Sequence, residues 1–375
     1  MKRFNERHAA VNGSTLQAQQ ATLDGAVDAS GPDWLRFVPA NVRGLVRSHL
    51  PAGLPDFAGP DGVTLPSEFG PSPHVTAKAV VPDGAQFLSR TFSNPAGTCP
   101  YKLYVPSSYM GQPVPLIVML HGCTQSPDDF AAGTGMNAAA EERTCLVAYP
   151  GQISSAHKQR CWNWYSEDDQ QRDSGEPSLI AGITRQVMQD YAVDPQRVHV
   201  AGLSAGGAAA AIMGETYPDL YAAVGVHSGL ACGVARDLPS AMAVMRRGGR
   251  AAVPPRQHGS VPRRLVPFVV FHGDRDTTVS PRNGDDVVEQ SMQDAALRSQ
   301  VRSGQAPGGR AYSRTIYSDV TGQPVGEQWV VHGAGHAWSG GNATGSYTDP
   351  QGPDATREML RFFQEHPHPT PGQAA

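Results

Sequence analysis

The chain has 375 residues, of which 39% are hydrophobic, so it is long enough to bury a large core. The 30 Lys and Arg residues against 34 Asp and Glu give a net charge of −4, and no basic stripe is present, so nucleic acid is not expected as a partner. No apolar run reaches the length of about 18 residues that a transmembrane helix needs.

Residues 1–80 are rich in Pro, Gly and Asp and lack sustained periodicity. We interpret them as an N-terminal extension that is partly irregular. Within it, residues 33–50 are amphipathic, which predicts a helix packed on the domain or a partly ordered arm, with adhesion to a surface as the alternative role. The first residues are basic, but no apolar stretch of signal-peptide length follows. We therefore expect a cytoplasmic protein, with secretion as the alternative.

From about Phe87 the sequence alternates between predicted strands and predicted helices. Residues 87–92 and 102–105 predict a hairpin around Asn94, Pro95 and Gly97. Continuous apolar runs, which are typical of parallel strands buried on both faces, lie at 115–120, 145–149, 197–201, 222–226, 266–271 and 328–331. Helices are expected near 126–142, 178–192, 205–216, 284–298 and 354–365.

This alternation predicts a mostly parallel, doubly wound α/β sheet flanked by helices over residues 81–366. Two segments interrupt it. Residues 246–265 are rich in Arg, Pro and Gly, which predicts a surface insertion, and residues 302–311 predict a second polar loop. Residues 367–375 are expected to be a disordered tail.

The main chemical signal is a G-x-S-x-G box in which Gly202 and Gly206 flank Ser204. The box stands where the strand 197–201 ends and an Ala-rich helix begins. This context defines the nucleophile elbow of α/β-hydrolases, a turn too tight for flanking side chains that leaves its serine exposed. Ser204 is therefore the predicted nucleophile.

A serine hydroxyl is a weak nucleophile and needs a base, for which the chain offers 13 histidines. In α/β-hydrolases the order along the chain is serine, acid, histidine, so the base should follow the last strand. His336 fits best, and His332, at the strand end, is the competitor. His227 and His272 are out of order, and we expect them to serve in packing and hydrogen bonding.

The acid should follow a strand between the nucleophile and the base. Two aspartates compete after the run 266–271. Asp274 stands at the strand turn and could tie down the loop, whereas Asp276 lies farther out and can reach the histidine. We predict that Asp276 orients His336 and stabilises its imidazolium form.

Acyl transfer also needs N–H donors for the oxyanion of the tetrahedral intermediate. One donor should be the backbone N–H of Ala205, directly after the nucleophile. The second should come from the loop after the strand 115–120, where we choose the N–H of Cys123. The neighbouring His121 is then a structural residue.

The chain has five cysteines, at positions 99, 123, 145, 161 and 232. No CxxC pair occurs, so we predict no zinc or other metal site. Cys123 and Cys161 both belong to loops expected at the carboxyl ends of strands. They could form a disulfide that stiffens the oxyanion loop, or they could remain free thiols.

Three tryptophans stand near the predicted site. Trp162 and Trp164 follow Cys161, and Trp338 follows His336. Aromatic side chains in loops over a site indicate an apolar cleft, so we predict these three as substrate-binding residues. Packing in the core is the alternative for each.

Five motifs occur in a fixed order: LHGCTQSPDDFAAGTGMN, RCWNWY, GLSAGG, HGDRDTTVSPRNG and GAGHAWSGG. Together they resemble the poly(3-hydroxybutyrate) depolymerase family of esterases, and the resemblance covers about residues 90–366. It implies an α/β-hydrolase fold, hydrolysis of polyhydroxyalkanoate esters and no cofactor. Carried over by motif, the triad is Ser204, Asp276 and His336.

We therefore expect an enzyme that hydrolyses poly(3-hydroxybutyrate) or its oligomers through an acyl-enzyme. A feruloyl or acetylxylan esterase is the alternative within the superfamily, and a non-catalytic protein of the granule surface is the alternative outside it. No carboxy-terminal substrate-binding module is recognised, so amorphous granules or soluble oligomers are expected rather than crystalline polymer. The sequence predicts no oligomeric state.

Overall fold

The computed structural model describes residues 79–249, 264–292 and 295–369. Nearly all of the predicted extension 1–80, with its predicted helix 33–50, lies outside the described residues. So do most of the predicted insertion 246–265 and the last six residues of the predicted tail 367–375. Within the described residues, no helix is both long enough and apolar enough to cross a bilayer.

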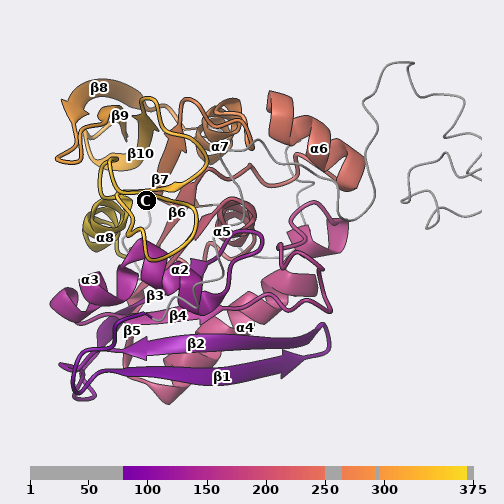
Figure 1. Ribbon diagram of the computed structural model, residues 1–375, viewed down its shortest axis with the longest axis vertical. Helices are drawn as coiled ribbons and strands as arrows, with labels where there is room; N and C mark the ends of the chain where they lie inside the picture. Colours follow the sequence, from indigo (N-terminus) through magenta and orange to yellow (C-terminus); the bar gives the residue numbers. More distant parts are fainter. Residues whose placement is uncertain (1–78, 250–263, 293–294, 370–375) are drawn as a thin grey trace, which may run out of the picture. The chain divides into compact units, whose positions relative to one another are not determined.

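The described residues form a ten-stranded sheet with the strand order β1-β2-β4-β3-β5-β6-β7-β10-β9-β8 (Figure 1). The strands are β1 Gln86–Asn94, β2 Gly97–Val105, β3 Val114–Leu120, β4 Leu146–Pro150, β5 Val193–Leu203, β6 Ala223–His227, β7 Phe268–Gly273, β8 Arg298–Gln305, β9 Ala311–Ser318 and β10 Pro324–Val331. The six from β4 to β10 in this order are parallel. The outer strands at each end pair antiparallel.

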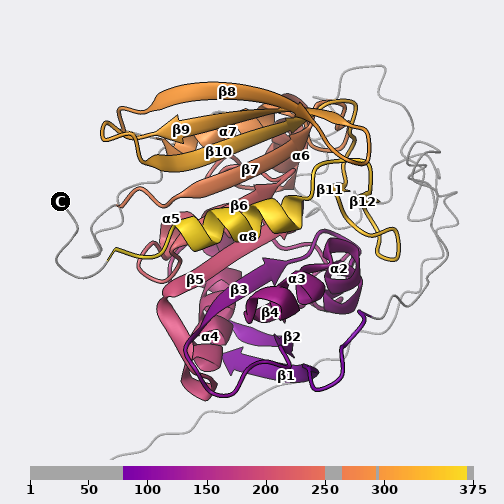
Figure 2. The same cartoon turned by 90° about the vertical axis from the view of Figure 1, so that its left-hand side faces the viewer.

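Helices cover both faces of the sheet (Figure 2). They are α2 Pro127–Thr134, α3 Met136–Arg143, α4 Gly175–Asp190, α5 Ala205–Thr216, α6 Leu238–Arg247, α7 Arg282–Ser291 and α8 Ala355–Glu365. Because successive side chains of a strand point to opposite faces, β3 contributes to two cores. Leu116 and Val118 pack in the core with α4, α5 and α7, whereas Ile117 packs with α2, α3 and α8. The predicted doubly wound, mostly parallel sheet is confirmed.

The predicted polar loop 302–311 is wrong, because these residues belong to the hairpin of β8 and β9. The strand β8 is exposed along its length and carries polar side chains on both faces, so it shows neither an apolar run nor an apolar alternation. The helix predicted to reach residue 298 ends at Ser291 instead.

Helix α6 was missed by the sequence analysis although a local signal exists for it. The Asp237 side chain accepts from the backbone N–H of Ser240, and the Ser240 side chain accepts from the Asp237 N–H. This reciprocal cap with a proline in the first turn is a typical helix start. At the other end of the chain, the N–H of His368 donates to Gln196 O at 2.8 Å, so the described part of the predicted tail contacts the domain.

Two short strands, β11 Trp338–Ser339 and β12 Thr348–Asp349, form a separate parallel pair after β10. They belong to the long connection between the main sheet and α8. The connection also carries His336, so its folding decides where the predicted base lies.

Candidate active site

Ser204 occupies the turn between β5 and α5, where the chain leaves the carboxyl end of the sheet. Its backbone has φ 58° and ψ −121°, a conformation that side chains rarely adopt. The turn is held because the Ser204 N–H donates to His227 O at 2.9 Å, on the neighbouring strand. Such strain at one residue is typical of functional sites, and it presents the half-buried serine at the edge of the sheet.

The two glycines of the box are required by close backbone approaches. A Cβ atom at Gly206 would lie 2.0 Å from Leu120 O, and one at Gly202 would lie 2.2 Å from Gly206 O. Helix α5 therefore starts directly against the end of β3, whose following loop holds Cys123. The tight turn brings the predicted nucleophile and the predicted oxyanion loop together: a Cβ at Gly122 would be 3.5 Å from Ser204 Cβ.

The structure pairs Asp276 with His336, with 2.7 Å between Oδ2 and Nδ1. The two residues follow β7 and β10, which are adjacent parallel strands, so their loops meet at the same edge. Both side chains are buried, with 5% and 6% of the residues exposed. The other oxygen, Oδ1, accepts from the N–H groups of Thr278 and Val279 at 2.9 and 2.8 Å.

These contacts indicate that Asp276 is ionised and which ring nitrogen of His336 carries the proton. Burial raises the pKa of the Asp276 carboxyl, but hydrogen bonds from His272 and His336 outweigh burial and hold it well below its usual range. An ionised carboxylate only accepts, so Nδ1 of His336 carries the proton. Its Nε2 is then the basic nitrogen that a general base needs.

The competing residues Asp274 and His332 pair with each other instead. Their Oδ2 and Nδ1 atoms are 2.9 Å apart, and 38% and 43% of the side chains are exposed. The Nε2 of His332 is occupied as well, by the Ser313 hydroxyl at 2.9 Å. The two aspartates thus serve two different histidines, one in the interior and one at the surface.

The loop that carries His336 is docked beside Ser204 through His227. The carbonyl of His227 accepts from Ser204, and its ring Nε2 accepts from the N–H of Ser339 at 3.0 Å. In the described part of the chain, neither the Ser204 hydroxyl nor Nε2 of His336 has a hydrogen-bond partner. Catalytic hydrogen bonds often tighten only with substrate bound, so the catalytic roles of this pair stay predictions.

Two backbone N–H groups are unpaired where the oxyanion should lie. In the loop after β3, the Gly122 N–H donates to Gln125 Oε1 and the Thr124 N–H donates to Gln159 O. Within the described residues the N–H of Cys123, between them, has no acceptor. Neither has that of Ala205, which as the first residue of α5 has no partner within the helix.

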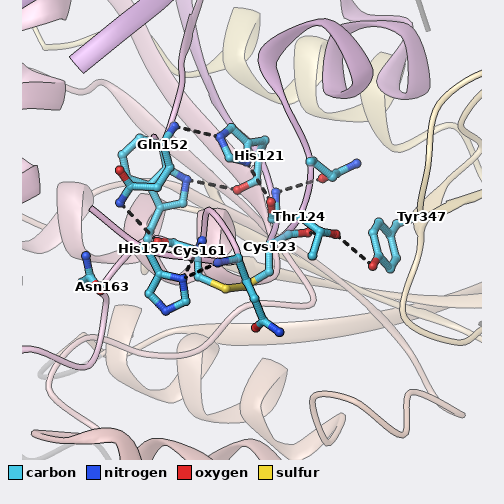
Figure 3. The surroundings of a disulfide bond; sticks show 12 residues. His121, Cys123, Thr124, Gln152, His157, Cys161, Asn163 and Tyr347 are labelled. Atoms are coloured by element: carbon cyan, nitrogen blue, oxygen red, sulfur yellow. Dashed lines mark hydrogen bonds between the residues drawn. A yellow bond between two sulfur atoms is a disulfide. The ribbon is translucent and has the colours of Figure 1, made fainter. Parts of the chain in front are cut away.

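Cys123 and Cys161 form a disulfide, and Figure 3 shows its surroundings. Besides the disulfide, hydrogen bonds from the loop of Cys161 hold the residues that flank Cys123, namely His121 and Thr124. His121 accepts at Nε2 from the Gln152 N–H at 3.0 Å and at its carbonyl from the Trp162 indole, also at 3.0 Å. Thr124 accepts at its carbonyl from the Arg160 guanidinium at 2.6 Å. The segment 121–124 is therefore clamped by the segment 152–162.

The clamp determines the chemistry of His121. Since Nε2 accepts from a backbone N–H, the proton is on Nδ1, which donates to Gly122 O at 2.7 Å. Burial lowers the pKa of His121 to about 4, so the ring is neutral. The structural role predicted for His121 agrees with these contacts.

Removing the disulfide by the double substitution Cys123→Ser and Cys161→Ser is expected to cost about 4 kcal/mol of unfolding free energy, because the bond closes a loop of 38 residues. The kcat should fall by less than the roughly 10²-fold that loss of an oxyanion donor causes, because Arg160, Trp162 and Gln159 still hold the loop. Denaturant titration with and without reductant measures the unfolding free energy, and steady-state kinetics measure kcat. Reductant should change the wild type and leave the double variant unchanged; an equal response in both would contradict the expectation.

The prediction of Trp162 and Trp338 as substrate-binding residues is corrected by the structure. Each is 1% exposed, and the indole N–H groups donate inside the protein, to His121 O and to the Thr356 hydroxyl. Trp164 is 7% exposed and packs edge-on against Tyr165. The three rings are packed in the core, and for Trp162 and Trp338 burial is tolerated because the one indole donor has a protein acceptor.

Glu176, in the first turn of α4, was missed by the sequence analysis. Its carboxylate accepts from the Asn163 N–H and amide, both at 2.7 Å, and from the Gln152 amide. It therefore ties together both ends of the clamp. Burial and the nearby Asp169 carboxylate raise the pKa of Glu176 to about 7. No sequence pattern joins these residues, which meet only in the folded chain.

The raised pKa of Glu176 predicts a pH-dependent stability. The unfolded chain releases this proton near pH 4.5 and the folded chain near pH 7, so the folded state binds more protons between them. Stability should therefore fall as pH rises through this window, by about 3 kcal/mol. The Glu176→Gln variant should lack this slope. Urea titrations of both proteins at several pH values test the prediction, and parallel pH profiles would contradict it.

The chain is similar in sequence to known esterases. The sequence pattern of the family described as esterase PHB depolymerase matches residues 99–310. Poly(3-hydroxyalkanoate) depolymerase C of Paucimonas lemoignei is 30% identical over 264 residues, which cover 66% of this chain and 60% of that protein. Feruloyl esterase B of Thermothelomyces thermophilus is 27% identical over 280 residues, which cover 69% and 93%.

The fold also matches a solved structure. An acetyl xylan esterase from Aspergillus awamori superposes with a TM-score of 0.57 at 21% identity, covering 75% of this chain and 99% of that one. The superposition supports the α/β-hydrolase fold alone. The chain spans 60% of the length of the Paucimonas depolymerase and 58% of the probable acetylxylan esterase A of Neosartorya fischeri.

Proposed function

Since this chain belongs to the esterase PHB depolymerase family, whose pattern covers residues 99–310, we propose that it hydrolyses carboxylic esters through an acyl-enzyme on Ser204. The observation that carries this proposal is the strained backbone of Ser204 at the β5–α5 turn. It stands next to two unpaired N–H groups and at the same edge of the sheet as the buried Asp276–His336 pair.

The reaction follows from these positions. Nε2 of His336 takes the hydroxyl proton while Oγ of Ser204 attacks the ester carbonyl, and the N–H groups of Cys123 and Ala205 hold the oxyanion. The ester oxygen leaves as an alcohol with the proton from His336. A water then gives a proton to His336 and attacks the acyl-enzyme, and His336 returns that proton to Oγ of Ser204 as the acid is released. The chain's own groups and water are sufficient for every step, and we propose no cofactor.

For the substrate, we propose a polyhydroxyalkanoate such as poly(3-hydroxybutyrate), or its oligomers. The support is the similarity to a protein named as a poly(3-hydroxyalkanoate) depolymerase. Acetylated xylan and feruloyl esters are the alternative, supported by the names of other relatives. Contact with a granule surface belongs to the same proposal. The Cys123–Cys161 disulfide favours the secreted alternative over a cytoplasmic location, because cytosolic thiols are kept reduced.

The test is a side-by-side assay of the purified protein on hydroxybutyrate oligomers, amorphous and crystalline polymer granules, methyl ferulate and acetylated xylan. Preferential release of hydroxybutyrate supports the proposed substrate, whereas faster release of ferulate or acetate supports the alternative. Labelling with a fluorophosphonate, followed by peptide mapping to Ser204, tests the chemistry apart from the substrate. A protein that is folded but neither labelled nor active would be a non-catalytic surface protein.

A further inference from the structure

His272 is a fully buried histidine that the proposed reaction does not use. It lies at the end of β7, four residues before Asp276, and is 2% exposed. Its Nε2 is 2.9 Å from Val279 O and 3.3 Å from Asp276 Oδ2. The same carboxylate oxygen accepts from His336 on its other side. Two histidines from neighbouring strands thus converge on one oxygen of the proposed catalytic acid.

The contacts of His272 decide which ring nitrogen carries the proton. A carbonyl oxygen and an ionised carboxylate both only accept, so the nitrogen that lies between them must be an N–H. Nε2 is therefore protonated and shares its hydrogen between Val279 and Asp276. The other nitrogen, Nδ1, is buried and has no partner in the described residues. A Cβ at Gly284 would lie 2.8 Å from Nδ1, so the ring is seated against this glycine.

A buried nitrogen without a partner costs free energy that an apolar side chain of similar size would avoid. An apolar side chain would lose both contacts of Nε2, the hydrogen bond to Val279 O and the contact with Asp276 Oδ2 in the site. The Asp276 carboxylate accepts from two backbone N–H groups on Oδ1 and from His336 on Oδ2, and the Nε2–H of His272 lies 3.3 Å from the same Oδ2. Without His272, Oδ2 of Asp276 contacts only His336, so a donor on one side alone orients this oxygen.

We propose that His272 is a positioning residue for the catalytic acid: its Nε2–H keeps Asp276 ionised and aimed at Nδ1 of His336. The inference rests on the proposed function of the triad. Two histidines contact the Asp276 carboxylate, His272 on β7 and His336 after β10, and a third, His227 on β6, is near enough to feel its charge. Burial lowers the pKa of His227 to about 3, so it stays neutral over the range of an activity assay.

The test compares two variants of similar size. His272→Leu removes the donor, and His272→Gln keeps an N–H donor at the distance of Nε2. Without the donor, the coupled Asp276–His336 pair binds a proton more readily, whether the proton settles on the carboxylate or on the imidazole. The acid limb of the kcat/KM profile should therefore move up by about one pH unit in His272→Leu. The kcat on the plateau should also fall, and His272→Gln should return the limb towards the wild-type position.

A purely structural role would lower activity equally at all pH values in both variants and leave the acid limb in place, and this result would overturn the proposal. A measurement on the wild type needs no variant: nitrogen NMR should show the proton of His272 on Nε2. A proton on Nδ1 instead would also overturn it. Fluorophosphonate labelling distinguishes failure of the proposed function from failure of this inference. An unlabelled wild type refutes the proposed function. A labelled wild type, with the acid limb of His272→Leu in the wild-type position, refutes only the role of His272.

Discussion

The Ser204→Ala variant is expected to lose about 10⁴- to 10⁶-fold in kcat for ester hydrolysis while it folds and binds substrate like the wild type. The substitution removes the oxygen that forms the acyl-enzyme and nothing else, because alanine keeps the Cβ atom and therefore the same backbone strain at φ 58°. The Ser204 hydroxyl makes no hydrogen bond in the described residues, so no other contact is lost. Burst and steady-state kinetics with an activated ester measure the change.

Ser228 provides a matched control. It stands directly after β6, it also has a positive φ, 48°, and its hydroxyl lies 3.2 Å from Nδ1 of His227. Ser228→Ala therefore removes a hydroxyl from a strained residue on the neighbouring strand without touching the proposed nucleophile. We expect its kcat to stay within a few-fold of the wild type. Comparable activity in the two variants would show that Ser204 is not the nucleophile.

Asp276→Asn is expected to lower kcat by about 10⁴-fold without unfolding the protein. The two N–H groups on Oδ1 will select the amide oxygen of asparagine for that position, so its NH₂ group turns towards His336. Nδ1 must then accept, and the proton moves to Nε2. A histidine with that proton in place cannot take one from Ser204. Nitrogen NMR of His336 measures the tautomer, and kinetics measure the loss.

Asp274→Asn is the control for this variant. Asp274 pairs with His332 at the surface and accepts from the Gly333 N–H at 2.7 Å, away from His336. We expect its kcat to remain within a few-fold of the wild type. A large loss in Asp274→Asn together with an active Asp276→Asn would reverse the assignment of the catalytic acid.

Much of the fold could be predicted because parallel strands buried on both faces read as continuous apolar runs. The runs 115–120 and 266–271 both became strands of the central sheet. The hairpin around Asn94 and Gly97 was predicted from its turn residues and is confirmed. The hairpin of the exposed strand β8 and the half-buried strand β9 was missed, because an apolar run or alternation appears only where a strand is buried.

Some residues of the site could also be predicted from the sequence, and others could not. Ser204 could be predicted because its turn needs glycines at fixed positions, and the choice of Asp276 over Asp274 followed from its distance along the loop. The burial of Trp162 and Trp338 could not be predicted, because a loop at the rim of a sheet can turn an aromatic ring inward or outward. Glu176 was missed because its partners Asn163 and Gln152 come from another part of the chain. His272 was expected only to pack and form hydrogen bonds, because the sequence does not show that its ring turns towards Asp276.

The polar strand β8 is also the outermost strand at one edge of the described sheet. An open edge offers unpaired N–H and carbonyl groups to a strand of another molecule, which is how sheets extend into aggregates and amyloid. Arg298 and Arg302 stand on this strand, and like charges repel a second copy that approaches in the same way. The polar composition that conceals β8 from a search for apolar patterns is thus also one that disfavours pairing of this edge with a second copy.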